Sequence, residues 1–262
     1  MENIMKIGFI GAGNMGGALA SAAKGELYIY DKDKKKAEML ANAIGAKYAE
    51  AKDIAKSCDL IFLGVKPNII PAAIEELKPS LSASATLISM AAGVAISKIE
   101  TLLGKEAAII RIMPNTPVAV GEGMILWCAN KSVSEKAKAD FLEVMKAAGS
   151  FDEIDEAKID AASAISGCGP AFVYMFIEAL ADGGVQCGLT RDAAQKYAEA
   201  TVAGAAKLAL KSGKHPGELK DAVCSPGGTT IAGVHALEQN SFRSAAMSAV
   251  TAAYEKTLKL KK

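Results

Sequence analysis

The chain has 262 residues, of which 51% are hydrophobic and 23% are charged, and its formal net charge is +1. This composition is typical of a soluble globular enzyme with one large domain or two small ones. Because the charge is nearly balanced, we expect no nucleic-acid partner and no binding to an anionic membrane surface.

The first half alternates strand-like and helix-like runs, which is the pattern of strand–helix–strand units. The predicted strands are Met5–Ile10, Glu26–Tyr30, Asp59–Val65, Ala85–Ser89, Ala107–Ile112, Met124–Ala129 and Ser150–Ile154. The predicted helices are Asn14–Lys24, Lys34–Ile44, Pro67–Leu77 and Ser134–Ala147. A continuous apolar strand such as Asp59–Val65 belongs in a parallel sheet that is covered on both faces. We therefore predict an α/β fold with a Rossmann-type doubly wound sheet, the dinucleotide-binding domain, over residues 1–154.

After about residue 155 the strands stop and the alanine-rich remainder is helical. The predicted helices are Ala171–Gln186, Arg191–Lys211, Pro216–Val223, Ile231–Gln239 and Phe242–Leu260. Gly188 and Ser212-Gly213 mark helix ends, and Thr190 and Ser241 are predicted N-caps. The apolar faces of these helices are too extensive for one small bundle. Residues 155–262 are therefore predicted to be an all-helical dimerisation and substrate domain, with a monomeric bundle as the alternative.

The five cysteines are odd in number and have no CxxC spacing, and the chain has two histidines. These facts argue against a disulfide framework and a metal site, and they favour a reducing compartment. Residues 1–10 lead directly into a glycine motif, and no uncharged apolar run reaches about 18 residues. We therefore expect no signal peptide, no membrane span and a cytoplasmic protein.

A dinucleotide-binding motif follows the first predicted strand and opens the first predicted helix. Its sequence is Gly11-Ala-Gly-Asn-Met-Gly16, with Asn14 and Met15 between the last two glycines. Gly11 allows a tight turn, Gly13 lets the backbone approach a pyrophosphate, and Gly16 permits close packing of helix on sheet. The predicted cofactor is therefore NADPH or NADH.

The residues after the second strand leave the choice between these two cofactors open. Asp31 closes that strand, where an acid bonds the adenosine ribose and repels a 2′-phosphate, which favours NADH. The lysines that follow, Lys32 and Lys34–Lys36, can pair with a 2′-phosphate and favour NADPH. They are equally compatible with a solvated helix start.

Further cofactor-binding candidates follow the carboxyl ends of the central strands, where ligands bind in such sheets. The candidates are Val65, Lys66, Pro67, Ala91, Ala92, Gly93 and Asn115. Lys66 lies either near the cofactor ribose or on the surface. The small residues Ala91–Gly93 would let a nicotinamide lie flat on the backbone. Asn115 either bonds the nicotinamide amide or orders a loop.

The segment Ser225-Pro-Gly-Gly-Thr-Thr230 lies directly before the predicted helix Ile231–Gln239. A helix start suits an anion such as a carboxylate, and the threonine hydroxyls add neutral donors and acceptors. Taken alone, such a turn is commonly a simple helix–helix connection. Together with the cofactor motif, it predicts a reductase that acts on a small acid.

Five motifs stand in order along the chain: Gly8-Phe-Ile-Gly-Ala-Gly-Asn-Met-Gly16, Val65-Lys-Pro67, Arg111-Ile-Met-Pro-Asn-Thr-Pro117, Ser166-Gly-Cys-Gly-Pro-Ala-Phe172 and Ser225–Thr230. With them the chain resembles the pyrroline-5-carboxylate reductases over its full length. The resemblance implies reduction of the cyclic imine 1-pyrroline-5-carboxylate to L-proline, the final step of proline biosynthesis. It also implies a homodimer, with a decamer of five dimers as a further assembly.

The resemblance also assigns the substrate site. It places the substrate at the dimer interface, surrounded by Ser225, Gly227, Gly228, Thr229 and Thr230. Thr230 is the candidate catalytic residue, whose hydroxyl would bond the ring nitrogen. A protonated iminium already carries the needed positive charge, so the chemistry demands no strong general acid, and positioning of the two reactants supplies much of the acceleration. Cys168 stands where the family commonly has serine, and a thiol is the weaker hydrogen-bond donor.

Two alternatives share parts of this pattern. The β-hydroxyacid dehydrogenases resemble one another by a catalytic lysine that is followed three residues later by asparagine in the helical domain. No Lys-x-x-Asn occurs between Ala161 and Lys262, which argues against this alternative. A nucleotide-sensing module without activity would need the first half of the chain but not the Ser225–Thr230 turn. Oxidation of NAD(P)H on addition of pyrroline-5-carboxylate separates these classes.

Overall fold

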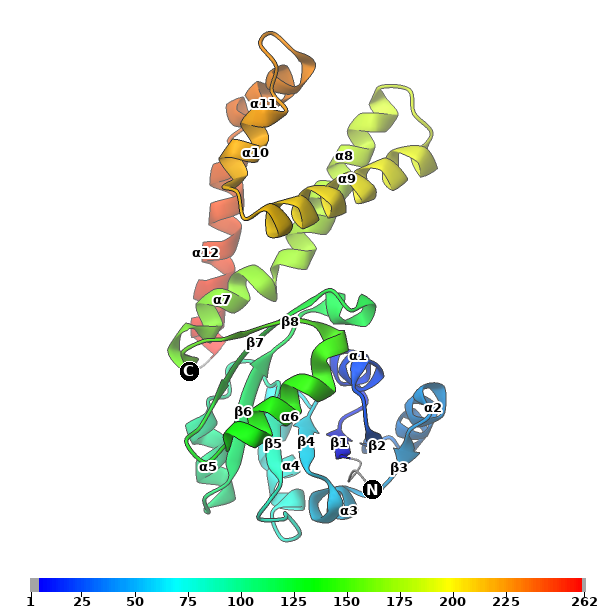
Figure 1. Ribbon diagram of the computed structural model, residues 1–262, viewed down its shortest axis with the longest axis vertical. Helices are drawn as coiled ribbons and strands as arrows, with labels where there is room; N and C mark the ends of the chain where they lie inside the picture. The colour runs from blue at the N-terminus through cyan, green and yellow to red at the C-terminus, as the bar shows by residue number, and fades with distance from the viewer. Residues whose placement is uncertain (1–4, 261–262) are drawn as a thin grey trace. The chain divides into compact units, whose positions relative to one another are not determined.

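The computed structural model describes residues 5–260, and internal contacts divide them into two compact units (Figure 1). One unit comprises residues 5–168 and 254–260, and the other is Gly169–Ala253. This division falls inside the helical part predicted from residue 155 onward. The reason is that α7 (Ile159–Ser166) packs against β7 (Gly123–Ala129) and so belongs to the first unit.

The first unit is built on an eight-stranded sheet, which confirms the predicted α/β doubly wound fold. The strand order is β3-β2-β1-β4-β5-β6-β7-β8. The strands are β1 (Lys6–Ile10), β2 (Glu26–Tyr30), β3 (Lys47–Tyr48), β4 (Leu60–Leu63), β5 (Thr86–Ser89), β6 (Ala108–Met113), β7 (Gly123–Ala129) and β8 (Gly149–Glu153). The order reverses between β1 and β4, and in open α/β sheets ligands bind outside the carboxyl ends of the strands at such a point.

Two strands at one edge run against the others. β7 pairs antiparallel with β6, and β8 pairs parallel with β7. The connection from β6 to β7 holds only the short 3₁₀ helix η2 (Thr116–Val120). A parallel crossover needs about a dozen residues or more, so this short connection forces an antiparallel neighbour.

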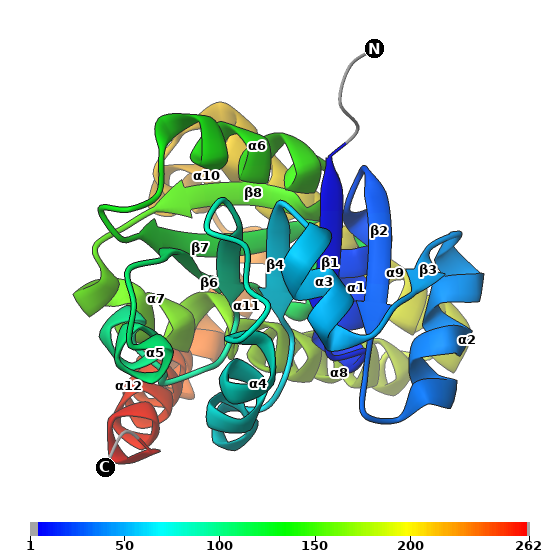
Figure 2. The same ribbon diagram turned by 90° about the horizontal axis from the view of Figure 1, so that it is seen from below.

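Helices cover both faces of the sheet with two buried apolar layers. Ile54, Ile74, Ile99 and Ile159 belong to the layer beneath α3, α4, α5 and α7. Leu19, Ala41 and Phe141 belong to the layer beneath α1, α2 and α6. Figure 2 shows α6 and α4 on opposite sides of the strands. The helices are α1 (Asn14–Ala22), α2 (Lys34–Ile44), α3 (Ala51–Ser57), α4 (Ile70–Leu77), α5 (Ile96–Leu103), α6 (Glu135–Met145) and α7 (Ile159–Ser166).

Three short elements, β3, α3 and α5, lie in segments to which the sequence assigns no element, and α7 lies in the part predicted to be helical without a predicted helix of its own. The helix expected from Pro67 to Leu77 forms in two parts, because the 3₁₀ turn η1 (Pro67–Ile69) precedes α4. Gly45 ends α2 with a φ of 70°, as its place after Ile44 indicates.

The second unit consists of helices. They are α8 (Gly169–Gln186), α9 (Arg191–Ser212), α10 (Pro216–Ala222), α11 (Thr229–Gln239) and α12 (Phe242–Leu260), whose last residues from Tyr254 are assigned to the first unit. The Thr190 hydroxyl accepts the Ala193 N–H, which confirms Thr190 as the N-cap of α9. Ser241 precedes α12 with a φ of 60°, rather than with the extended backbone of an ordinary N-cap.

Much of the apolar surface of the second unit lies outside its own core. A buried cluster consists of three alanines, Ala181, Ala194 and Ala198. In contrast, Met175 is 70% exposed and Leu210 is 84% exposed. By length and composition alone, the segment Glu156–Gln186 could cross a membrane, whereas the sequence predicts no membrane span. Within the most apolar 18 residues of this segment, 11% are buried. An apolar surface of this extent marks an interaction site.

Candidate active site

The glycine-rich loop between β1 and α1 is packed too closely for side chains at two positions. Gly11 has a φ of 108°, and a Cβ there would lie 2.6 Å from the carbonyl oxygen of Gly64. A Cβ on Gly16 would lie 2.4 Å from the carbonyl oxygen of Gly11. The first and third glycines therefore let the loop turn and let α1 start directly against the sheet.

Gly13 has a different environment. It is the N-cap of α1, and a Cβ built on it meets no heavy atom within 4 Å. The open space lies where the first backbone N–H groups of α1 point, at the positive end of the helix dipole. Asn14 is exposed and Met15 is half-buried beside it. This loop therefore fits the pyrophosphate of a dinucleotide.

Asp31 is tied to the glycine-rich loop. Its Oδ2 accepts the N–H of Ala12 at 2.8 Å, and its Oδ1 accepts the N–H of Asp33 at 3.0 Å. Two backbone donors thus fix the carboxylate at the end of β2, beside the start of α1. A carboxylate at this place can accept a hydrogen bond from a ribose hydroxyl, and its negative charge would repel a 2′-phosphate.

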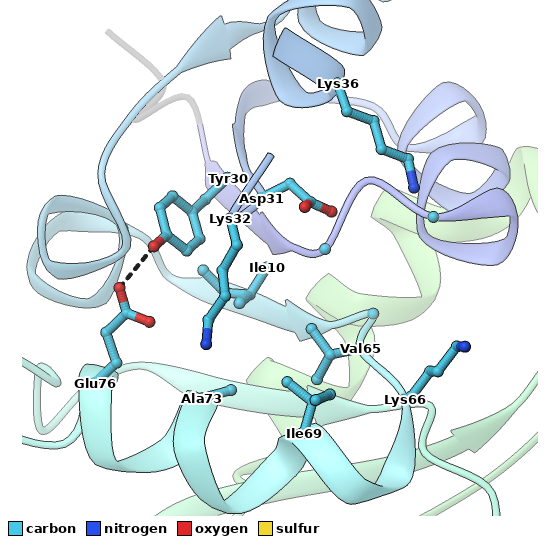
Figure 3. A pocket seen from close by; sticks show the side chains of 13 residues that line it. Ile10, Tyr30, Asp31, Lys32, Lys36, Val65, Lys66, Ile69, Ala73 and Glu76 are labelled. Carbon is cyan, nitrogen blue, oxygen red and sulfur yellow. Dashed lines mark hydrogen bonds between the residues drawn. The ribbon is translucent and has the colours of Figure 1, made fainter. Parts of the chain in front are cut away.

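A cleft of about 290 Å³ opens between the carboxyl end of β2 on one side and η1 and α4 on the other (Figure 3). It is lined by Ile10, Gly11, Gly13, Tyr30, Asp31, Lys32, Lys36, Gly64, Val65, Lys66, Ile69, Ala73 and Glu76. The structure thus brings five of the predicted cofactor residues together: Gly11, Gly13, Asp31, Val65 and Lys66. Tyr30 and Glu76 are lining residues that sequence reasoning missed.

Tyr30 and Glu76 join the two walls of this cleft. The Tyr30 hydroxyl donates to Oε1 of Glu76 at 2.7 Å. This hydrogen bond to a carboxylate, with some burial, raises the pKa of Tyr30 to about 12. The tyrosine therefore stays protonated, and keeps donating, well above neutral pH.

The other strand-end candidates lie at the same edge of the sheet but outside the lining of the cleft. Leu63 pairs with both Ile10 and Ser89, so β1, β4 and β5 end side by side. Ala91 is buried, Ala92 is exposed, and Gly93 has a φ of 74°. This places small residues next to the expected path of the cofactor. Pro67 starts η1 and is exposed.

Asn115 is buried and both ends of its side chain bond the protein. Its Nδ2 donates to the carbonyl of Ser166 at 2.9 Å, and its Oδ1 accepts the N–H of Met124 at 2.9 Å. Of the two interpretations that the sequence left open, the ordering of a loop accounts for these contacts.

Arg111, in the same motif as Asn115, is a buried charge that sequence reasoning did not single out. It is 1% exposed, and it pairs with Glu156 and Asp160 at 3.1 Å each. Its position inside the apolar strand Ala108–Met113 was the available signal, because a lone charge there must find partners.

The predicted substrate residues lie in the second unit, at the turn before α11. The carbonyl of Ser225 accepts the Gly228 N–H at 3.0 Å, and Gly227 has a φ of 68°, so the segment is a tight turn that requires glycine. Gly228 is the N-cap of α11, and Thr229 and Thr230 form its exposed first turn. The start of α11 therefore offers amides and hydroxyls suited to a carboxylate.

The Rossmann sheet, the glycine-rich loop and the adjoining cleft define an NAD(P)-dependent oxidoreductase. A family model for pyrroline-5-carboxylate reductase dimerisation matches residues 156–260, and one for NADP oxidoreductase, coenzyme F420-dependent, matches residues 6–93. The chain belongs to the pyrroline-5-carboxylate reductase family, because it is at least 40% identical to members of that family over nearly its whole length.

Relatives match along nearly the whole chain. The chain is 42% identical to the pyrroline-5-carboxylate reductase of Escherichia coli K12, over 98% of each protein. It is 40% identical to that of Arabidopsis thaliana, over 97% of this chain and 95% of the relative. The crystal structure of Plasmodium falciparum pyrroline carboxylate reductase with NADP bound superimposes with a TM-score of 0.88 at 40% identity, covering all of both chains.

Proposed function

We propose that this protein is an NAD(P)H-dependent pyrroline-5-carboxylate reductase. It reduces the C=N bond of 1-pyrroline-5-carboxylate and yields L-proline, the last step of proline biosynthesis. The observation that carries this proposal is the 42% identity to a relative of that name over 98% of the chain, because the match includes both the glycine-rich loop and the Ser225–Thr230 turn.

The cofactor residues lie in residues 1–154, the proposed dinucleotide-binding domain. Gly11, Gly13 and Gly16, with Asn14 and Met15, hold the pyrophosphate, and Asp31 bonds the ribose. The remaining contacts come from Val65, Lys66, Pro67, Ala91, Ala92 and Gly93, whereas Asn115 orders the loop beside them. The open space at Gly13 and the cleft beside Asp31 support this assignment. NAD(P)H, when bound, supplies the hydride.

The substrate residues lie in residues 155–262, the proposed dimerisation and substrate domain. Ser225, Gly227, Gly228, Thr229 and the first-turn amides of α11 hold the carboxylate. The hydroxyl of Thr230 bonds the ring nitrogen and fixes the ring for attack on its imine carbon. A charged iminium needs an oriented partner rather than a strong acid at this atom, and a neutral hydroxyl meets that need.

The helical domain joins two chains, and each site takes cofactor residues from one chain and substrate residues from the other. The exposed side chains of Tyr174, Met175 and Leu180 support a partner that covers α8. On this basis the apolar segment Glu156–Gln186 contacts a second copy and no membrane, and the enzyme works in the cytoplasm as a dimer or as a decamer of five dimers.

Two measurements test this function. Oxidation of NADH or NADPH should depend on added pyrroline-5-carboxylate, and its absence with both cofactors would contradict the proposal. Mixing the impaired Gly13→Val chain with the impaired Thr230→Ala chain should restore part of the activity above that of either variant alone, because some hybrid sites combine two intact halves. No recovery in hybrids whose mass shows that they formed would place both halves of a site in one chain.

A further inference from the structure

The far end of the cofactor cleft carries a polar pair that the proposed function leaves unused. Figure 3 shows Glu76 at the opposite end of the cleft from Lys66, facing Tyr30 across the gap. On the basis of the proposed NAD(P)H-dependent function, we propose that Glu76 recognises the amino group of the cofactor's adenine base and that Tyr30 positions Glu76.

The order of groups along the cleft supports this place for the base. The glycine-rich loop takes the pyrophosphate, and Asp31, at the end of β2, lies next to it along the same wall. The adenine follows the ribose, so it reaches the part of the cleft beyond Asp31. There the α4 side presents Val65, Ile69 and Ala73, which are apolar and suit the flat face of a base (Figure 3).

The chemistry of Glu76 matches one edge of adenine. An ionised carboxylate has two oxygens and only accepts hydrogen bonds. Tyr30 uses Oε1, and within residues 5–260 Oε2 has no other partner. Adenine carries a 6-amino group, which is a donor. Hypoxanthine carries a carbonyl oxygen at the same position, which would face the carboxylate as a second acceptor.

Tyr30 holds the carboxylate of Glu76 in one orientation. Glu76 is a surface side chain on α4, and a free glutamate would lose rotamer entropy on meeting a ligand. The 2.7 Å bond from Tyr30 holds the carboxylate across the cleft before a ligand arrives. The raised pKa of Tyr30, about 12, keeps this donor protonated over the whole range in which the enzyme would be assayed.

The test compares NADH with its hypoxanthine analogue, reduced nicotinamide hypoxanthine dinucleotide, in direct binding measured by titration calorimetry. The two ligands share the nicotinamide, both riboses and the pyrophosphate. The parent protein should bind NADH about fivefold or more tightly than the analogue. A hydrogen bond to a charged carboxylate is stronger than a neutral one, but solvent weakens it here because Glu76 is exposed. Glu76→Gln should bring this ratio close to one, because an amide can either accept or donate.

Two further variants separate recognition from structure. Tyr30→Phe should give an intermediate ratio, because the acceptor remains but is no longer held in place. Glu75→Gln, which removes the same charge from the neighbouring position of α4 outside the cleft, should keep the parent ratio. The proposal is overturned if the parent binds both ligands equally, or if Glu76→Gln keeps the parent ratio. Failure of the reductase itself would appear separately, as no turnover of pyrroline-5-carboxylate with either cofactor.

Discussion

Nη2 of Arg111, on β6, lies 3.1 Å from Oδ1 of Asp160, in the first turn of α7. The other terminal nitrogen of the guanidinium, Nη1, donates to Oε1 of Glu156 at the same distance. Asn115, just beyond β6, bonds the carbonyl of Ser166, the last residue of α7. Arg111 and Asn115 therefore hold α7 on the sheet, one at the start of the helix and the other at its end.

Loss of the guanidinium should be costly, because the buried carboxylate of Asp160 would lose the cation with which it pairs. We expect Arg111→Met to lower the free energy of unfolding by about 3–5 kcal/mol. Lys136→Met, which breaks the solvent-exposed pair with Asp140, should cost about 1 kcal/mol or less. Urea unfolding of both variants measures the difference. Equal losses would show that the buried pairs do not stabilise α7 in this way.

Variants of two glycines of the loop, Gly13 and Gly16, should separate cofactor binding from folding. Gly13→Val adds a side chain in open space, so the free energy of unfolding should change by about 1 kcal/mol or less, while NAD(P)H affinity falls tenfold or more. Gly16→Ala places a Cβ against the Gly11 carbonyl, so it should destabilise the fold by about 1–3 kcal/mol. Unfolding and cofactor titrations on the same samples check both. Unchanged cofactor binding in Gly13→Val would reject its assigned role.

The sequence predicted the long elements and the glycine-rich loop because their signals are local. The two residues of β3 and the seven of α3 are too few to show a sustained period. The helix α5 has apolar residues at helical spacing, Ile96, Ile99 and Leu103, but over only about two turns. The partners of Arg111 and Asn115 were out of reach for a different reason. Asp160 and Ser166 lie 49 and 51 residues away along the chain, so only the fold brings them together. The same holds for Tyr30 and Glu76, which are 46 residues apart.

The cofactor preference should respond to the charge at position 31. Asp31→Ser removes the negative charge that a 2′-phosphate would meet, so the ratio of kcat/KM for NADPH over NADH should rise. Asp33→Ser is the matched control, because it removes the same charge two residues away while serine can still cap α2. An unaltered ratio in Asp31→Ser would show that Asp31 does not read the ribose. Equal shifts in both variants would indicate a general charge effect instead.

Two cysteines should resist alkylation in the folded protein. Burial raises the pKa of the Cys58 thiol and of the Cys128 thiol to about 11 each, so little reactive thiolate forms at pH 8. Mass spectrometry after iodoacetamide treatment should find both unmodified in the native protein and both modified in urea. The raised pKa means that the folded state favours the neutral thiol. The stability that this contributes should be fully present below pH 9.0, the ordinary pKa of the thiol, and should be lost as the pH rises to about 11. Rapid native labelling at pH 8 would contradict the burial of these two thiols.

The hydroxyl of Thr230 should matter more for turnover than for substrate affinity. A hydrogen bond to a neutral group is worth about 0.5–1.5 kcal/mol, and one to a charged nitrogen is worth more, so Thr230→Ala should lower kcat roughly tenfold or more. The amides at the start of α11 should still hold the carboxylate, so KM should change less. Thr230→Ser keeps the hydroxyl and should retain most of the activity. The two variants therefore differ in one group at one place, and steady-state kinetics distinguishes them directly. If both variants match the parent, Thr230 is only a residue of the first turn of α11, whose N-cap is Gly228.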